Sequence, residues 1–355
     1  MHAISTPADP PADLIHPARQ HRRLAPPTLI VWLAVALAAC ATHAGLPHTS
    51  RIRVILDTDA NNELDDQHAI AYLLFNDDVF EPEGITVNAT KSGGNIDEQA
   101  AEAERIVRLS AAESRVAVIK GAQGSFETIA PHVMDARFDG SAAVDLIVRR
   151  ARQAESRRLV LIAVGKLTNV ALALKRDPSI ASRMRVVWLG SNYPDPGEYN
   201  QDNDPAALDY LLDAAVEFEI VLVRYGKPSG TDAVRVTMDE IRQHMSGAGP
   251  RIAASVTGRN GGTFTTFGDY SVDLFEHSQK YGTPPSRALF DLAAVAIVKQ
   301  PKWATRTTIP APILTGGAWV ERPSNPRRIA LWHDFDRDHI VADLFESVTR
   351  PALVH

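Results

Sequence analysis

The sequence predicts one large α/β domain in which a mainly parallel sheet is flanked by helices. Short apolar runs rich in β-branched residues recur along the chain, and stretches of helical periodicity lie between most of them. Apolar strands that alternate with helices are typical of a parallel sheet covered on both faces. Because no change of composition divides residues 51–355, we expect a single domain over this range.

The expected elements follow one another regularly over the first two thirds of the domain. Strands are expected at residues 54–56, 84–87, 116–119, 159–164, 186–189 and 220–223. Helices are expected at residues 66–76, 96–112, 141–155, 168–176 and 205–215. Asp204 and Pro205 mark the start of the last of these helices, since proline is favoured at the first helical position.

The last third of the domain is expected to be richer in helix. The stretch "TMDE" at residues 237–240 has the pattern of a capping box, and residues 286–300 form the most apolar helical stretch. Residues 327–348 predict a strand, a turn and a closing helix. Residues 257–283, which are rich in glycine and aromatic side chains, are expected to form an insertion in the domain.

Residues 1–40 read as a signal peptide and residues 41–50 as a linker. The apolar run "TLIVWLAVALAAC" at 28–40 is shorter than the roughly 20 residues of a transmembrane helix, but it suits a secretory signal. It ends in "LAAC", whose cysteine is the only one in the chain and which resembles a bacterial lipobox, so Cys40 is the expected lipidation site. The alternatives are cleavage after "THA" at 42–44 and an uncleaved anchor.

Both leading interpretations of this segment export the protein. We expect a periplasmic or cell-envelope lipoprotein that meets the membrane only through its lipid anchor. The net charge of −6, with no basic stripe, argues against a nucleic-acid partner. The sequence leaves the oligomeric state open, a homo-oligomer included.

Five carboxylates fall within ten positions after the first expected strand. Such groups repel one another and raise each other's pKa values when nothing neutralises them. A helix N-terminus stabilises one or two carboxylates there, but not five. A hard divalent cation such as Ca²⁺ or Mg²⁺ takes about six or more oxygen ligands and would hold the whole set. The five residues are Asp57, Asp59, Glu63, Asp65 and Asp66.

The stretch "VILDTDANNELDDQHAIAYLL" resembles the signature of the inosine–uridine-preferring nucleoside hydrolases. Three later stretches resemble motifs of the same family, in the family's order. They are "LIAVGKLTNVALALKRDP" at 161–178, "WLGSNYPDPGEYNQDNDPAALDYLL" at 188–212 and "ALFDLAAVA" at 288–296. The resemblance implies a nucleoside-hydrolase-like fold and a small ribosyl compound as the substrate.

The resemblance also implies a Ca²⁺ site and a catalytic base. The ion would be held by Asp59, Asp66, the main-chain carbonyl of Val164 and Asp291. Asp59 would in addition take a proton from a water activated by the ion, and this makes it the expected catalytic residue. An oxocarbenium-like sugar would be favoured by the surrounding carboxylates.

A second set of residues is implied to contact the substrate. Most of them are carboxylates and amides, which can hydrogen-bond the ribose hydroxyls. They are Asp57, Asp65, Asn88, Asn192, Glu198 and Asn200.

The chain departs from the family pattern at two places. Five residues, "ANNEL" at 60–64, separate Asp59 from the Asp-Asp pair where the family usually has three; we call them the spacer, and Glu63 within it is a candidate additional ligand. Phe290 stands where other members commonly have a histidine that helps the base to leave. His277, Tyr281 and Phe290 are the expected base contacts. Ring-bearing side chains of the variable stretch that could contact a base are Phe264, Phe267, Tyr270, Phe275, His277 and Tyr281.

Two polar residues within these motifs are expected to have structural roles. We expect Asn169 to cap the helix at 168–176 and His68 to lie on a helix surface. Asp291 is different, because burying an unpaired carboxylate in an apolar helix is costly.

The leading hypothesis is a Ca²⁺-dependent hydrolase that cleaves the N-glycosidic bond of a ribonucleoside or a related ribosyl compound. One alternative is a non-catalytic lipoprotein that binds a metal ion and ribose. Another is a haloacid-dehalogenase-type phosphatase, which also has Asp-x-Asp after its first strand. That class expects Thr or Val where this chain has Asn61.

Overall fold

The computed structural model describes residues 51–353. These residues fall in one compact unit. The predicted signal peptide over 1–40, Cys40 and the linker over 41–50 lie outside the described residues. Among residues 51–353, no helix is both long enough and apolar enough to cross a membrane.

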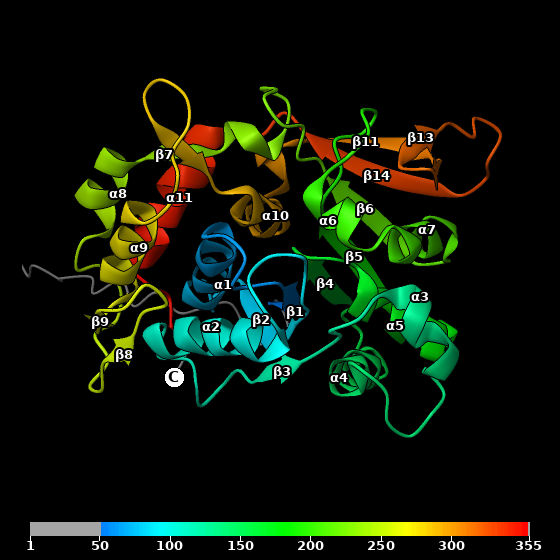
Figure 1. Cartoon of the computed structure of the whole chain (residues 1–355), viewed down its shortest axis with the longest axis horizontal. Helices are drawn as coiled ribbons and strands as arrows, with labels where there is room; N and C mark the ends of the chain where they lie inside the picture. Colours follow the sequence, from blue (N-terminus) through cyan, green and yellow to red (C-terminus); the bar gives the residue numbers. More distant parts are fainter. Residues whose placement is uncertain (1–50, 354–355) are drawn as a thin grey trace, which may run out of the picture. The chain divides into compact units, whose positions relative to one another are not determined.

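An eight-stranded sheet forms the centre of the domain (Figure 1). Its strands pair in parallel except β11, which is antiparallel to β14. The predicted mainly parallel α/β fold is therefore confirmed. In spatial order the strands are β11 (Thr305–Pro310), β14 (Arg328–His333), β6 (Glu217–Val221), β5 (Met184–Leu189), β4 (Leu159–Ala163), β1 (Ile52–Thr58), β2 (Phe80–Val87) and β3 (Val118–Lys120).

Helices cover both faces of this sheet and create two separate apolar cores (Figure 1). Successive strand side chains point to opposite faces, so Val54 and Leu56 of β1 enter one core and Ile55 enters the other. The first core packs α1 (Asp65–Phe75), α2 (Ile96–Leu109), α8 (Met238–Met245), α9 (Phe267–Glu276), α10 (Phe290–Lys299) and α11 (Arg337–Thr349). The second packs α3 (Phe126–Ile129), α4 (Ser141–Ala151), α5 (Thr168–Arg176) and α7 (Pro205–Asp213).

Shorter elements complete the chain. Three two-stranded sheets pair β7 (Arg235–Thr237) with β10 (Ser286–Ala288), β8 (Val256–Thr257) with β9 (Thr263–Phe264), and β12 (Ile313–Thr315) with β13 (Ala318–Val320). One short helix, α6 (Tyr199–Asn203), precedes α7. The 3₁₀ turns are Ala130–His132, Pro178–Arg183, Thr231–Ala233 and Pro301–Trp303.

The two predicted helix starts are confirmed. Asp204 caps α7 with Pro205 at its first position, and Thr237 and Glu240 form the predicted capping box of α8. The predicted strand, turn and closing helix are β14 and α11. The helix predicted over 286–300 begins only at Phe290, because residues 286–288 pair with β7 instead.

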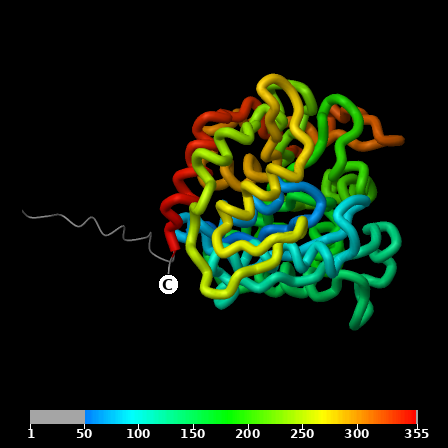
Figure 2. Tube along the Cα trace, turned by 60° about the vertical axis from the view of Figure 1, so that its left-hand side comes forward, coloured from blue at the N-terminus to red at the C-terminus, as the bar shows by residue number. Residues whose placement is uncertain are grey.

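The stretch at 257–283 packs against the beginning of the domain. Figure 2 shows the yellow segment with β8, β9 and α9 beside the blue and cyan segments that contain α1 and α2. Tyr270 of α9 donates a hydrogen bond to the buried Glu102 of α2 at 2.7 Å. This stretch is therefore joined to the same core as the helix that carries Asp65 and Asp66.

Candidate active site

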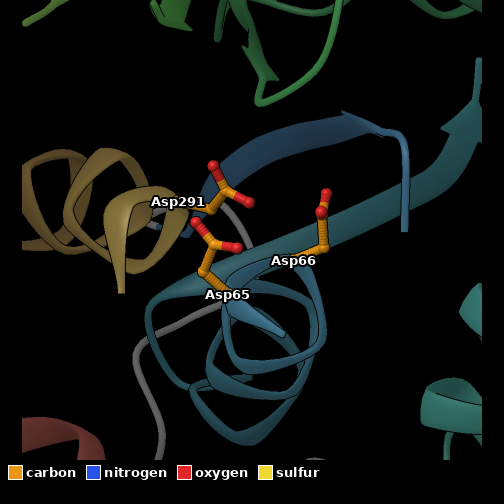
Figure 3. Close-up of side chains that lie close together, drawn as sticks. All are labelled: Asp65, Asp66 and Asp291. Carbon is orange, nitrogen blue, oxygen red and sulfur yellow. The ribbon is translucent and has the colours of Figure 1, made fainter. Parts of the chain in front are cut away.

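Three carboxylates meet where two helices begin. Asp65 and Asp66 open α1, and Asp291 lies in the first turn of α10. All three are buried, and each offers an oxygen within 4.8 Å of the others. Figure 3 shows the three side chains extending to the same side of the two helices. We call Asp65, Asp66 and Asp291 the carboxylate triad.

The two helix starts support each other. The backbone N–H groups of Phe290 and Asp291, at the start of α10, interact with the Asp65 carboxylate and lower its pKa. The hydroxyl of Thr58, the last residue of β1, donates to the carboxylate of Asp66. Free N–H groups at a helix N-terminus favour an anion. Contacts from β1, α1 and α10 therefore hold the triad in place.

A cavity of about 360 Å³ opens beside the triad at the carboxyl end of β1. Ligands of open α/β sheets bind at this end of the strands. The structure brings most of the predicted site residues to this one cavity. Those that line it are Asp59, Glu63, Asp65, Asp66, Val164, Glu198, Asn200, Tyr281, Phe290 and Asp291.

Asp57 does not line the cavity but lies behind it. Its carboxylate accepts hydrogen bonds from Thr86 at 2.5 Å, Asn169 at 2.7 Å and Asn88 at 3.0 Å. Burial raises the pKa of Asp57 to about 6, and these hydrogen bonds oppose the shift. Asn88 is buried with Asp57, and its Oδ1 accepts no hydrogen bond from the described residues.

The expectation that Asn169 caps a helix is wrong. The helix α5 has Leu167 at its N-cap position, and Asn169 lies inside its first turn. Its amide donates to Asp57, 112 positions earlier, and its Oδ1 accepts from the N–H of Ala122 at 2.8 Å. Asn169 therefore belongs to the support of Asp57.

Burial and mutual repulsion raise the pKa values of the cavity carboxylates. Burial is the larger cause and raises the pKa of both Asp59 and Asp65 to about 7. Burial and then the charges of neighbouring aspartates raise the pKa values of Asp66 and Asp291 well above the usual value. Such a cluster gains from a cation that lowers all of these pKa values together.

The donor set fits a hard divalent cation. It consists of carboxylate oxygens and carbonyls, which are the ligands that Ca²⁺ prefers. The carbonyl of Val164 faces the same cavity and accepts a hydrogen bond from Asn200 at 3.1 Å. Asp59 is close enough to raise the pKa values of the triad, and Thr90 donates to its carboxylate at 2.5 Å.

The predicted ribose contacts divide into two groups. Glu198 and Asn200 line the cavity, and the Glu198 carboxylate accepts N–H bonds from Ser191 at 2.9 Å and Gln201 at 3.0 Å. Asn192 is not among the lining residues. Its Oδ1 accepts from the N–H of Tyr225 at 3.1 Å, so it holds the loop that carries Tyr225.

The cavity lining also contains residues that the sequence analysis missed. Tyr225 meets Phe290 edge to face, with 5.8 Å between ring centroids. Arg287 forms an ion pair with Glu63 and lies over the ring of Tyr281. No local pattern marks these residues, because their neighbours in the cavity are distant in sequence. Further missed lining residues are Asn62, Tyr199, Asp232 and Arg235.

Several ring-bearing candidates lie elsewhere. Phe267, Tyr270 and Phe275 are fully buried in the first core, and the half-exposed His277 lies outside the cavity lining. His68, expected at a helix surface, is also fully buried. Its Nδ1 contacts the carbonyl of Leu64 at 2.6 Å and its Nε2 contacts Ser271 at 2.7 Å.

The fold and the cavity define an α/β protein with a carboxylate-rich site for a small ligand. The family model for "Inosine-uridine preferring nucleoside hydrolase" matches residues 54–342. The chain therefore belongs to the inosine–uridine preferring nucleoside hydrolase family. This excludes the phosphatase alternative, which requires a different family.

Curated relatives and solved structures agree with this assignment. The chain is 31% identical over 193 residues to a probable uridine nucleosidase of Oryza sativa subsp. japonica, covering 48% of this chain and 58% of that protein. It is 26% identical over 253 residues to an inosine-uridine preferring nucleoside hydrolase of Leishmania major, covering 66% and 74%.

Two solved structures share the fold over most of the chain. One is a plant nucleoside hydrolase, with a TM-score of 0.65 and 18% identity over 84% of this chain and 99% of that chain. The other is a purine-preferring ribonucleoside hydrolase from Gardnerella vaginalis, with a TM-score of 0.61 and 20% identity over 84% and 98%. The nucleoside-hydrolase-like fold is therefore confirmed.

Proposed function

We propose that the protein is a Ca²⁺-dependent hydrolase that cleaves the N-glycosidic bond of a ribonucleoside or a related ribosyl compound. The observation that carries this proposal is the carboxylate triad, which shares one cavity with Asp59 in a member of this family. The relatives named as nucleosidases and nucleoside hydrolases support the same reaction.

The triad, Asp59 and the carbonyl of Val164 are the residues that would hold the ion. When bound, Ca²⁺ supplies charge that polarises water and lowers its pKa. Asp59, on the cavity wall, would accept the proton of the attacking water at its carboxylate. The other buried carboxylates would favour the positive charge that develops on the sugar.

The cavity lining offers groups for both parts of a nucleoside. Asn200 and Glu198 offer polar groups for ribose hydroxyls. Tyr225, Tyr281 and Phe290 offer rings in the same lining, against which a planar base can pack. Holding both parts would place the anomeric carbon near Asp59, which is catalysis by positioning.

The test is the release of reducing sugar from a panel of ribonucleosides by the wild type and Asp59→Ala, with and without a chelator. We expect release by the wild type, loss of release in the chelator, recovery on addition of Ca²⁺, and at least a hundredfold lower rate for Asp59→Ala. Mg²⁺ is added in a parallel arm to test the choice of ion. Absence of turnover on every ribosyl compound would contradict the proposal.

One observation favours a binding function without turnover. None of the described residues that line the cavity is a histidine, and Phe290 occupies the place of the usual one. The same panel distinguishes this alternative. Calorimetric binding of a ribosyl compound in the presence of Ca²⁺, with no sugar released, would identify a ribose-binding protein.

We propose in addition that the protein is exported and anchored by a lipid on Cys40. The support is the apolar run and the "LAAC" tetrapeptide at residues 28–40. Expression of the wild type and Cys40→Ser in a bacterial host tests this. We expect the wild type in the membrane fraction with a lipid mass on Cys40, and the variant without that mass. Cleavage after residue 44 would instead leave a protein without Cys40.

A further inference from the structure

The spacer, residues 60–64, is held on one side by α2 and the segment before it. The N–H of Asn61 donates to Gln99 Oε1 at 2.7 Å, and the Asn61 amide donates to the carbonyl of Gly93 at 2.8 Å. Gly93 has a φ of +78°, and a Cβ there would lie 2.7 Å from the spacer backbone. The spacer is therefore in direct contact with this segment.

On its other side the spacer is held by one arginine of the 257–283 stretch. Nη1 of Arg259, in the loop between β8 and β9, donates to the carbonyls of Glu63 at 3.1 Å and Asn61 at 3.3 Å. A guanidinium offers several donors in a fixed plane, which suits it to bridging two carbonyls. These carbonyls lie two and four positions before Asp65.

Arg259 is itself fixed in place by a buried network. Its N–H donates to Tyr270 Oη at 3.3 Å, and Tyr270 donates to Glu102 of α2. Arg105 ion-pairs with Glu102 and donates to the carbonyl of Thr257 at 2.6 Å. The loop that carries Arg259 is thus attached to α2 independently of the spacer.

The triad depends on where the spacer ends. Leu64, at the N-cap position of α1, makes no side-chain capping bond, so the first turn of α1 has no cap of its own. Asp65 and Asp66 follow immediately, and their oxygens must stay close to Asp291 on a different helix. Small displacements of ligands weaken a metal site.

We infer that Arg259 is a positioning residue for the carboxylate triad: it holds the spacer so that Asp65 and Asp66 face Asp291. The inference rests on the proposed metal site and goes beyond it by explaining how the longer spacer keeps its place. The ion pair of Glu63 with Arg287 braces the same spacer from the β10 side.

The test measures Ca²⁺ binding by calorimetry on the full chain. We expect Arg259→Ala to raise the Kd for Ca²⁺ at least tenfold, because both bonds to the spacer are lost. Arg259→Lys keeps the charge and the stem but not the fork, and we expect an intermediate Kd. Arg251→Ala is the matched control, since Arg251 lies shortly before the same stretch and donates to Thr265 within it rather than to the spacer. Its Kd should equal that of the wild type.

A purely structural role gives a different result. It would lower the melting temperature of Arg259→Ala in a chelator and leave the Kd of both Arg259 variants unchanged, and this would overturn the inference. If Arg259→Ala does not fold, Arg259→Lys decides the question by the same measurement. Sugar release is followed on the same samples. A wild type that binds Ca²⁺ without releasing sugar contradicts the proposed hydrolysis alone.

Discussion

Thr90 favours the ionised form of Asp59, the proposed base. Its hydroxyl donates to the Asp59 carboxylate at 2.5 Å, and this bond lowers a pKa that burial raises to about 7. A hydrogen bond to the ionised form favours that form. Removing it therefore raises the pKa of Asp59 further and leaves less of the base ionised at neutral pH.

We predict that Thr90→Val moves the acid limb of the pH profile of kcat/KM at saturating Ca²⁺ to higher pH, because the hydroxyl favours ionised Asp59 at whatever pKa the bound ion gives it. Thr90→Ser keeps the hydroxyl and should behave like the wild type. The measurement is the initial rate of sugar release between pH 5 and pH 9. An unchanged limb in Thr90→Val would show that Asp59 is not the group that titrates.

Asp291 adds repulsion among the buried carboxylates and would be a ligand of the proposed ion. The charges of Asp65, Asp66 and Asp59 add to burial in raising its pKa. We predict that Asp291→Asn weakens Ca²⁺ binding at least tenfold, and that in a chelator its free energy of unfolding is equal to that of the wild type or higher. Calorimetry and urea unfolding measure the two quantities. Lower stability in the chelator would show that Asp291 has a favourable partner of another kind.

At the scale of helices and strands, the sequence patterns correctly predicted the features that depend on local interactions. The apolar runs became β1, β2, β4, β5 and β6, and Thr237 with Glu240 formed the predicted capping box. Long-range contacts explain the failures. Residues 286–288 became a strand because β7, some 50 positions earlier, pairs with them.

The same distinction applies to the candidate site. The acidic stretch and three later motifs predicted about half of the cavity lining, because their residue types are tied to fixed positions at strand and helix ends. The buried His68 contacts Ser271, 203 positions later, and Asn169 donates a hydrogen bond to Asp57, 112 positions earlier. The spacing of residues within one helix or strand cannot predict contacts between residues so far apart in the sequence.

The capping box of α8 provides a prediction at this scale. Thr237 accepts the N–H of Glu240 at 3.2 Å, while the Glu240 carboxylate accepts the N–H of Thr237 at 2.8 Å. We predict that Thr237→Ala lowers the free energy of unfolding by about 1 kcal/mol, the usual effect of losing such a cap. Thr237→Ser should retain most of it. Urea unfolding measures both, and the Kd for Ca²⁺ should not change, since α8 does not line the cavity.

At the scale of the whole molecule, the two ends of the central strand β1 have different surroundings. The described residues begin at its amino end, and the carboxylates of the cavity lie at its carboxyl end. Arg51 precedes the amino end of β1, whereas Asp59 follows the carboxyl end. The strand has seven residues, which span roughly 23 Å at about 3.3 Å per residue. The length of β1 therefore separates the start of the described residues from the carboxylates of the cavity.

The acidic cluster also makes stability depend on pH and Ca²⁺ together. Burial raises the pKa values of Asp59 and Asp65 in the folded chain without an ion to about 7, from the ordinary value of 3.8. The folded state therefore binds protons more tightly than the unfolded state. The stability from these groups is complete below about pH 4 and is lost as the pH rises through about 7.

We predict that Ca²⁺ raises the melting temperature little at pH 5 and much more at pH 8, because at pH 8 the ion replaces the missing protons among ionised carboxylates. The buried His68 has the opposite effect: burial lowers its pKa to about 4, so its contribution is lost as the pH falls from 6.5 through 4. That contribution is the same with and without Ca²⁺ and cancels in the difference. Thermal unfolding in Ca²⁺ and in chelator at the two pH values gives this difference directly. Asp291→Asn should reduce the difference at pH 8, and an equal effect of Ca²⁺ at both pH values would contradict binding by ionised carboxylates.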